Sequence, residues 1–381
     1  MKQLYKSILF VATIIVATML NWSCDTNDSS SGGTPYILYV RVTNPASADS
    51  LLVSAGQGQL IAIVGGNLQN TREVWFNDQK ATFNPVYITN TTVLVNVPTQ
   101  IPGDVNNKLK LIFANKDSLL YDFNVKINKP TVSAMDNEYA LDGETTVIRG
   151  QYFYFPVTVT FQGGGTVTSD DGGVTVNATN TAITLKVPEG AQPGQITVAT
   201  NFGTTKSDFM FRDDRNIFEG FDDPTGAGNN ITDPGDGDPP LINGPYSRLI
   251  NPAMGSWVWT ELFSWVINHN IPDDAILNPG DYNYKFEVNT VNPYNANGVR
   301  IWVSSQDSNT NGSFYSWNPP LDTQGKWQTV VIPLGDIMSA NVPIGVLPNY
   351  FFSFVFCGDG TLNCDMCFDN FRIVPKVIQD I

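Results

Sequence analysis

Two stretches of the chain repeat one order of short strands and turns, and this repeat constrains the fold more than any other feature. Residues 34–129 contain strand patterns at 36–40, 59–65, 73–76 and 92–98, and residues 130–213 contain them at 131–132, 146–153, 157–161 and 182–188. In each stretch one strand ends in Gly, the next is rich in Val or Phe, and an alternating strand ends in Val-Pro. Short strands with turn signals at regular spacing are typical of β-sandwiches. We therefore predict two tandem β-sandwich domains, at 34–129 and 130–213.

The repeat resembles the IPT/TIG family of immunoglobulin-like domains, and its second copy matches better than its first. The resemblance rests on Val147-Ile-Arg-Gly-Gln-Tyr-Phe153 and Val187-Pro-Glu-Gly190, with Pro193-Gly194 just after them. Members of that family that stand next to glycan-binding modules usually act as spacers. The resemblance therefore implies that both immunoglobulin-like domains are scaffold.

Residues 214–381 depart from the repeat, and a loop rich in Gly, Pro, Asn and Asp at 221–240 marks their start. Strand patterns continue from there to residue 374, with no helix pattern of any length between them. Such a series suits a jelly roll or a similar two-sheet sandwich, in which one concave sheet can receive a chain-like ligand. The predicted class is all-β: two immunoglobulin-like (IPT/TIG) sandwiches, then a jelly-roll-like carbohydrate-binding β-sandwich at 214–381.

The charge balance narrows the range of partners. The 381 residues carry 36 acidic and 21 basic side chains, which gives a formal net charge of −15. This excess of acidic groups argues against nucleic acid or anionic lipid as a ligand, because both would be repelled. A neutral ligand or a cation suits such a chain better.

The N-terminus has the pattern of an export signal. Lys2 and Lys6 precede an apolar run at 8–20, which is too short to span a bilayer comfortably. Ser23 and Cys24 follow, and then a polar stretch to residue 33, an arrangement that resembles a bacterial lipoprotein cleavage site. We predict a signal peptide at 1–23, a diacylated Cys24 as membrane anchor, and a flexible tether at 24–33. Simple secretion, with Cys24 discarded or free, is the alternative.

The other three cysteines, Cys357, Cys364 and Cys367, lie near the C-terminus. In an exported protein a disulfide is permitted. The segment between Cys357 and Cys364 has the composition of a hairpin loop, so we expect these two to pair and Cys367 to stay a buried thiol. A single CxxC without a second pair or a nearby His does not predict zinc.

Six of the eight tryptophans lie between residues 257 and 327. Tryptophan is a rigid side chain that either fills a core or forms a binding surface, and strand alternation separates the two roles. In the segment 299–304 the odd-numbered positions are aliphatic and belong in the core. Arg300 and Trp302 therefore face outward, and an exposed Trp beside a charged donor is unusual enough to indicate a ligand.

Alternation in the segments 256–261, 282–289 and 313–318 adds side chains to this surface. The predicted binding set combines aromatic rings with Arg, Glu and Asn: Trp257, Trp259, Glu287, Asn289, Arg300, Trp302, Tyr315 and Trp317. The apolar face of a pyranose stacks on an indole, while neighbouring charged and amide groups bind the hydroxyls and select the sugar. The set therefore predicts a neutral carbohydrate ligand.

The C-terminal third resembles the glycan-binding domain of cell-surface lipoproteins from starch-utilisation-like systems of Bacteroidota. The likeness lies in the segments 275–281, 285–290, 315–319, 325–334 and 368–372, and in the order of lipid anchor, spacers and terminal binding domain. It implies non-catalytic capture of a polysaccharide at the outer membrane for an adjacent transporter. A plant β-glucan or xyloglucan is the preferred ligand, and mannans and fructans remain open. In related jelly rolls, Glu219 and Asp369 would correspond to ligands of a structural calcium.

Two other classes remain open. A glycoside hydrolase needs two carboxylates that face the scissile bond, and Glu261 and Glu287 are the strand glutamates expected near the aromatic surface. A Ser-His-Asp hydrolase is not predicted, because the single histidine, His269, has no Ser motif around it. The third class is a surface adhesin or structural protein, which would leave the aromatic residues without a role.

The acidic loop before residue 240 could also hold calcium, through Asp233, Asp236 and Asp238. Its spacing does not match an EF-hand loop, which needs alternating ligands, a central Gly and a distal Glu. We therefore expect this loop to be solvated.

Overall fold

The computed structural model describes residues 33–378, apart from residue 48 and the segments 223–228, 268–269 and 306–311. The predicted signal peptide, Cys24 and His269 lie outside the described residues. The chain divides into two compact units between Ile127 and Asn128. Within the described part of the chain, no helix is long and apolar enough to cross a membrane.

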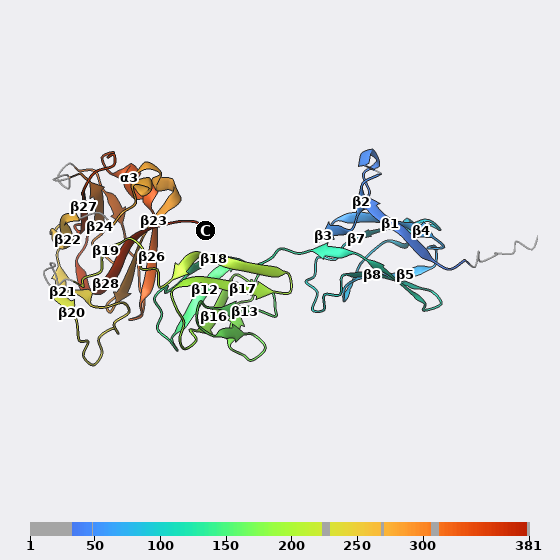
Figure 1. The fold of residues 1–381 in the computed structure, drawn as a ribbon, viewed down its shortest axis with the longest axis horizontal. Helices are drawn as coiled ribbons and strands as arrows, with labels where there is room; N and C mark the ends of the chain where they lie inside the picture. Colours follow the sequence, from blue (N-terminus) through green and yellow to red (C-terminus); the bar gives the residue numbers. More distant parts are fainter. Residues whose placement is uncertain (1–32, 48, 223–228, 268–269, 306–311, 379–381) are drawn as a thin grey trace, which may run out of the picture. The chain divides into compact units, whose positions relative to one another are not determined.

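The first unit is a sandwich of two antiparallel four-stranded sheets, in the orders β2-β1-β4-β7 and β6-β5-β8-β9 (Figure 1). A short parallel pair, β3 with β10, lies beside them. Alternate strand residues such as Val40, Ile61 and Leu111 fill the space between the sheets. The strands are β1 (Tyr36–Val42), β2 (Leu51–Leu52), β3 (Ser54–Gly56), β4 (Leu60–Gly66), β5 (Thr71–Phe76), β6 (Gln79–Lys80), β7 (Thr92–Asn96), β8 (Lys108–Phe113), β9 (Ser118–Asp122) and β10 (Asn124–Lys126).

The second unit begins with another sandwich, whose sheets have the orders β11-β12-β16-β15 and β14-β13-β17-β18. Its core is separate, and Ile148, Val159 and Val198 are fully buried in it. The strands are β11 (Thr131–Met135), β12 (Thr145–Gln151), β13 (Thr158–Thr160), β14 (Thr166–Thr168), β15 (Val174–Val176), β16 (Ala182–Lys186), β17 (Gly194–Thr200) and β18 (Gly203–Phe211). The expected immunoglobulin-like pair is therefore present.

The glycine that ends one strand in each repeat has the same structural reason in both sandwiches. A Cβ on Gly65 would lie 1.9 Å from the carbonyl oxygen of Tyr36, and one on Gly150 would lie 1.8 Å from that of Thr131. At each position the strand runs against the first strand of its sandwich, where the register shifts as at a β-bulge. Only glycine allows that approach.

The rest of the second unit is a larger sandwich with two sheets. One has the order β20-β21-β28-β23-β26, with β19 also beside β28, and the other has the order β22-β27-β24-β25. The strands are β19 (Ile217–Glu219), β20 (Asn229–Ile231), β21 (Tyr246–Met254), β22 (Thr260–Ile267), β23 (Tyr282–Thr290), β24 (Val299–Ser304), β25 (Tyr315–Trp317), β26 (Gln328–Pro333), β27 (Tyr350–Phe356) and β28 (Leu362–Pro375). The predicted all-β class is confirmed.

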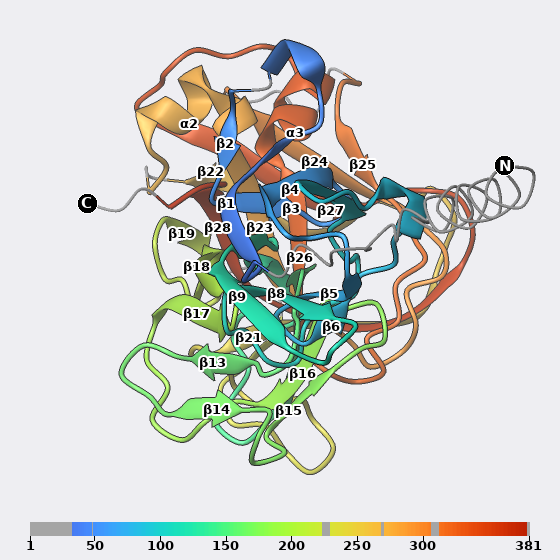
Figure 2. The ribbon, with the colours of Figure 1, turned by 90° about the vertical axis from the view of Figure 1, so that its right-hand side faces the viewer.

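An aromatic core fills this third sandwich. Phe286, Phe354 and Phe371 are fully buried between the sheets, with ring centroids 4.9–5.4 Å apart. Two short helices, α2 (Asp273–Leu277) and α3 (Leu334–Ala340), interrupt the strands. Because α3 contacts strands of both sheets, it covers one end of the sandwich (Figures 1 and 2).

Candidate functional site

The outer face of the sheet β22-β27-β24-β25 carries a group of large side chains that we call the aromatic shelf. In β24, Val299, Ile301 and Val303 face the core, and the intervening side chains face outward. This is the alternation that the sequence predicts. The aromatic shelf consists of Trp257, Trp259, Arg300, Trp302 and Phe314.

Trp302 lies on the predicted side of β24, but the prediction that it is exposed is wrong. The indole is only 1% exposed. Trp259 covers it at a centroid distance of 5.7 Å, and Phe314 lies 5.5 Å away. Trp302 therefore supports the other rings from beneath. Its indole nitrogen is buried and has no hydrogen-bond partner in the described part of the chain.

Trp257 and Trp259 are the exposed rings, at 61% and 43%. They lie in the loop between β21 and β22, whereas the sequence predicts a strand from residue 256. The indole nitrogen of Trp259 donates to the Glu261 carboxylate at 2.6 Å, which orients this ring. The predicted accessible aromatic surface thus exists, with these two side chains as its outer layer.

The backbone holds Trp257 in a conformation that few residues adopt. Its φ angle is 59°, in the left-handed region, where a bulky residue is strained by about 1–3 kcal/mol. The Trp257 amide donates to the carbonyl of Gly358 at 2.7 Å, and the Gly358 amide donates to the side chain of Asn297 at 2.8 Å. A Cβ on Gly358 would lie 2.2 Å from the amide nitrogen of Gly298. The loop around Gly358 therefore fixes an exposed ring in place.

Arg300 joins the two ends of the shelf. Its guanidinium carbon lies 4.4 Å from the centre of the Phe314 ring and 5.8 Å from that of Trp257. A planar guanidinium stacks on aromatic faces and still presents N–H donors at its edge. Arg300 thus places hydrogen-bond donors beside an exposed indole, which is the combination that a sugar ring requires.

Tyr315 and Trp317 lie on the opposite face from the one predicted. Strand β25 pairs with β24 so that Tyr315 lies opposite Ile301 and Trp317 opposite Val299, and both rings turn toward the core. Trp317 is half-buried and lies 4.9 Å from the ring of Tyr294. The segment contains no aliphatic residue to mark its inner face, so alternation alone gave the wrong side. Phe314, which the sequence pattern does not indicate, packs against Trp302 on the outer face.

Glu287 and Asn289 lie on the predicted side of β23, yet neither is exposed. The second immunoglobulin-like domain covers this face. The Glu287 carboxylate accepts from Arg372 at 2.6 Å, and Arg372 also donates to Glu138 of that domain at 2.8 Å. Asn289 donates to the carbonyl of Gly325 at 2.9 Å. The prediction that these two side chains bind sugar is therefore wrong, because both are fully buried.

Burial raises the pKa of Glu287 above its ordinary value, although the Arg372 guanidinium opposes the rise. The same burial argues against Glu261 and Glu287 as the catalytic pair of a glycoside hydrolase, which the sequence left open. Glu261 is exposed on the outer face of one sheet, whereas Glu287 is enclosed behind the other. Two carboxylates must flank the same glycosidic bond to hydrolyse it. Glu261 and Glu287 do not form such a pair.

The expected disulfide is absent: Cys357, Cys364 and Cys367 are buried free thiols. Each belongs to a different cluster. Cys357 packs beside Trp302 under the shelf, Cys364 faces the sandwich core, and Cys367 lies on the outer face of the six-stranded sheet. The prediction of a disulfide between Cys357 and Cys364 is therefore wrong, since their side chains belong to different sheets and faces.

The calcium ligands implied by the resemblance lie on neighbouring strands. Glu219 in β19 accepts from the amide of Phe221, and Asp369 in β28 accepts from that of Asn370. Burial raises the pKa of Asp369, whose second carboxylate oxygen has no hydrogen-bond partner among described residues. Among all the residues that the structure describes, no group of three or more His, Cys, Asp or Glu side chains is placed to hold a metal ion. Calcium stays a prediction.

Asp238, in the acidic loop, is not simply solvated. Its carboxylate accepts from Arg248 at 2.5 Å and from the amide of Gly235 at 2.9 Å. These contacts attach the loop to β21, and they also lower the pKa of Asp238. Asp233 and Asp236 are exposed, whereas these contacts leave Asp238 half-buried.

Comparison with known families identifies the domain that carries the shelf. Residues 211–375 match the family described as the surface glycan-binding protein B xyloglucan binding domain. The expected family is confirmed for this domain. The match spans both sheets of the third sandwich, including every residue of the aromatic shelf.

One solved structure extends the likeness beyond the glycan-binding domain. It is the crystal structure of the surface glycan-binding protein PbSGBP-B from Prevotella bryantii, which is 26% identical in sequence and has a TM-score of 0.71. The alignment covers 90% of this chain and 99% of that protein's chain. An IPT/TIG domain-containing protein of Bacteroides ovatus is 31% identical over 163 residues. That alignment takes in 40% of this chain and 33% of the relative, so the chain spans about a third of that protein's length.

Proposed function

We propose that the chain captures a neutral plant β-glucan, xyloglucan in the first place, on the aromatic shelf and does not cleave it. The observation that carries this proposal is the pair of exposed indoles, Trp257 and Trp259, on one sheet face. Buried Trp302 and stacked Arg300 hold them in position. The match of residues 211–375 to a xyloglucan binding domain supports the choice of polysaccharide.

The geometry suits stacking along a chain. Two indoles present apolar faces to the C–H faces of sugar rings, and Glu261 and Arg300 supply an acceptor and donors at their edges. A sheet surface open to solvent can receive an internal segment of a long polysaccharide, whereas an enclosed pocket would take only a chain end. We therefore include binding along the chain in the proposal.

Affinity gel electrophoresis tests this proposal. The protein should be retarded in gels that contain xyloglucan, and Trp257→Ala and Trp259→Ala should each weaken binding by about 1–3 kcal/mol, the size of one aromatic stack. Trp75→Ala is the matched control, because Trp75 belongs to the first unit and its indole nitrogen donates to Glu73. Release of reducing ends by the purified protein would contradict capture without cleavage.

The proposal places the protein on the cell surface, attached to the outer membrane through a lipidated Cys24 and beside a transporter. The relatives named as surface glycan-binding proteins support the surface location. Cys24→Ala should move the protein from the membrane fraction to the soluble fraction without changing its affinity for xyloglucan. Retention of this variant in the membrane would argue against the lipid anchor.

A further inference from the structure

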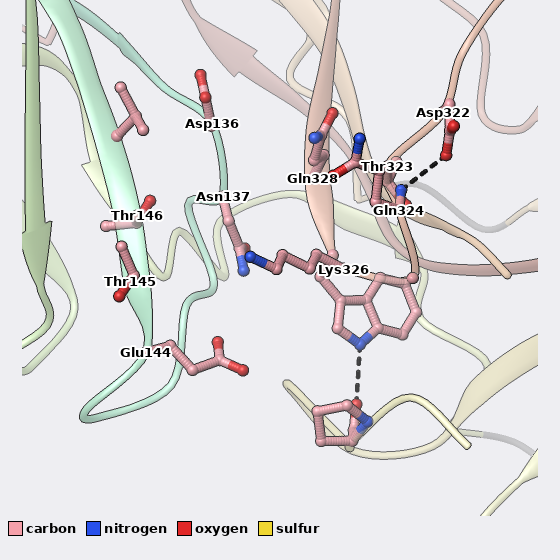
Figure 3. Close-up of a pocket in the computed structure, with 14 residues that line it drawn as sticks. Asp136, Asn137, Glu144, Thr145, Thr146, Asp322, Thr323, Gln324, Lys326 and Gln328 are labelled. Atoms are coloured by element: carbon pink, nitrogen blue, oxygen red, sulfur yellow. Dashed lines mark hydrogen bonds between the residues drawn. The ribbon is translucent and has the colours of Figure 1, made fainter. Parts of the chain in front are cut away.

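A cavity of about 570 Å³ lies between the second immunoglobulin-like domain and the glycan-binding domain, inside the second unit (Figure 3). We call it the junction cavity. One wall comes from residues 136–137 and 144–147, at the start of β12, and the other comes from residues 322–328, just before and within β26. Strand β26 belongs to the six-stranded sheet. The junction cavity is therefore separate from the aromatic shelf, which lies on the other sheet.

The two walls are fixed to each other by bonds across the domain boundary. The Thr329 amide donates to the carbonyl of Asp136 at 2.8 Å, and the Glu138 amide donates to the Thr329 hydroxyl at 2.8 Å. Behind them the Glu138 carboxylate pairs with both Lys285 and Arg372. These ion pairs are buried at the domain boundary, where loss of one partner would leave the other charge uncompensated. The cavity is thus preformed, and neither domain provides it alone.

The lining carries three carboxylates, those of Asp136, Glu144 and Asp322, and one ammonium group, that of Lys326; the Asp136 carboxylate is already paired with Arg149. Figure 3 shows Glu144 and Thr145 on one wall and Gln324 and Gln328 on the other, with Lys326 extending toward Asn137. The Thr146 hydroxyl, on the first wall, is buried and has no hydrogen-bond partner among described residues. The carboxylates disfavour an anion, and the Lys326 ammonium group offsets part of their attraction for a cation. The remaining match is a neutral ligand with many hydroxyls.

An aromatic ring completes the lining. Trp327 is 4% exposed, and its indole nitrogen donates to the carbonyl of Pro240 at 2.9 Å. The ring packs edge to face on Tyr246 at 5.3 Å. Pockets for small ligands have volumes of roughly 300–1,000 Å³ and combine an apolar wall with a few fixed polar groups. One or two sugar rings fit that description.

We propose that the junction cavity is a second carbohydrate subsite, which takes a chain end or a side-branch sugar of a neutral polysaccharide. This inference rests on the proposed function, because it assumes that the protein meets such chains. The shelf receives the backbone of a polysaccharide on one sheet, and the cavity holds a terminal sugar beside the other. A protein with both sites holds two segments of polysaccharide at once.

The test uses the protein from residue 33 to 381 labelled with 5-fluorotryptophan and observed by fluorine NMR. Signals of Trp327, Trp257 and Trp259 are assigned from single Trp→Phe variants. Glucose, xylose and galactose are then titrated separately as probes. At least one should shift the Trp327 signal in a saturable way. Thr145→Tyr, which adds a ring at an exposed position of the cavity wall, should abolish that shift.

Thr175→Tyr is the matched control, because Thr175 is exposed on β15 of the same domain and does not line the cavity. It should leave the shift unchanged. A Trp327 signal that responds to none of the three sugars overturns the proposal. So does a shift that survives Thr145→Tyr or that never saturates. Xyloglucan added to the same sample reports the shelf through Trp257 and Trp259, so failure of the proposed function is seen separately.

Discussion

The indole of Trp259 covers that of Trp302, with ring centroids 5.7 Å apart and ring planes inclined at 38°. The outer ring is 43% exposed and the inner one is 1% exposed. The two side chains therefore have different roles. Trp259 is accessible to a ligand, and Trp302 holds the Trp259 ring in position. Substitutions at the two positions should separate ligand binding from stability.

Trp302→Ala should lower the free energy of unfolding by about 3–5 kcal/mol, because it leaves a cavity among buried side chains. Trp259→Ala should cost far less stability, since its ring already contacts water, yet it should weaken xyloglucan binding more directly. Urea unfolding and affinity electrophoresis of both variants measure the two effects. Equal losses of stability at the two positions would contradict this division.

Arg300→Lys should weaken glycan binding several-fold while leaving the free energy of unfolding within about 0.5 kcal/mol of wild type. An ammonium group keeps the charge but loses the planar stack on Phe314 and Trp257. Lys110→Arg in the first unit is the matched control, because Lys110 lies over Trp75 at 5.4 Å. Calorimetric titration with a xyloglucan oligosaccharide measures the affinities. Unchanged affinity in Arg300→Lys would remove Arg300 from the site.

Arg372→Met should destabilise the second unit by about 3–5 kcal/mol, because Glu138 and Glu287 would be left buried without their shared cation. Adding Glu287→Gln to this variant should recover part of the loss, since it removes one uncompensated charge. Chemical unfolding of the single and double variants checks the expectation. A double variant less stable than Arg372→Met would show that charge burial is not the cause.

The thiol of Cys364 should make the fold sensitive to alkali. Burial raises its pKa to about 12, and the thiol donates to the carbonyl of Leu249 at 3.5 Å. The ordinary pKa of this thiol is 9.0. When the pH is above that value, the unfolded chain releases the proton while the folded chain retains it. The free energy of unfolding therefore falls as the pH rises from 9 toward 12. Cys364→Ala should show a shallower loss of stability over that range in urea unfolding. An identical slope in both proteins would rule out this thiol as the source.

Alternation predicted side-chain direction correctly wherever aliphatic residues mark the core. Val299, Ile301 and Val303 fix the inner face of β24, so the outward direction of Trp302 is readable from the sequence. In β25 every residue is aromatic or polar, so none marks the inner face of the strand. Only the pairing with β24 determines that Trp317 faces the core. That pairing is a long-range contact, which local pattern does not contain.

The direction in which a side chain points also does not determine whether it is exposed to solvent. Glu287 points away from the sandwich core as predicted, but the second immunoglobulin-like domain covers it. Glu138 and Tyr139, which make that cover, stand more than a hundred residues away in an unremarkable polar segment. Trp302 is likewise covered by a loop residue and by Phe314. The sequence indicates the strand face, whereas burial depends on what later packs against it.

The domain junction implies that the glycan-binding domain depends on its neighbour for stability. Residues 214–381 alone would expose the side chains of Lys285 and Arg372 without Glu138, and the apolar group around Trp327 and Tyr246 without Tyr139. We expect this fragment to unfold at a lower urea concentration than residues 128–381, in which the junction is intact. Both fragments retain the aromatic shelf, so at low urea both should still bind xyloglucan if the shelf alone forms that site. Equal midpoints of urea unfolding for the two fragments would show that the junction contributes nothing to the stability of the glycan-binding domain.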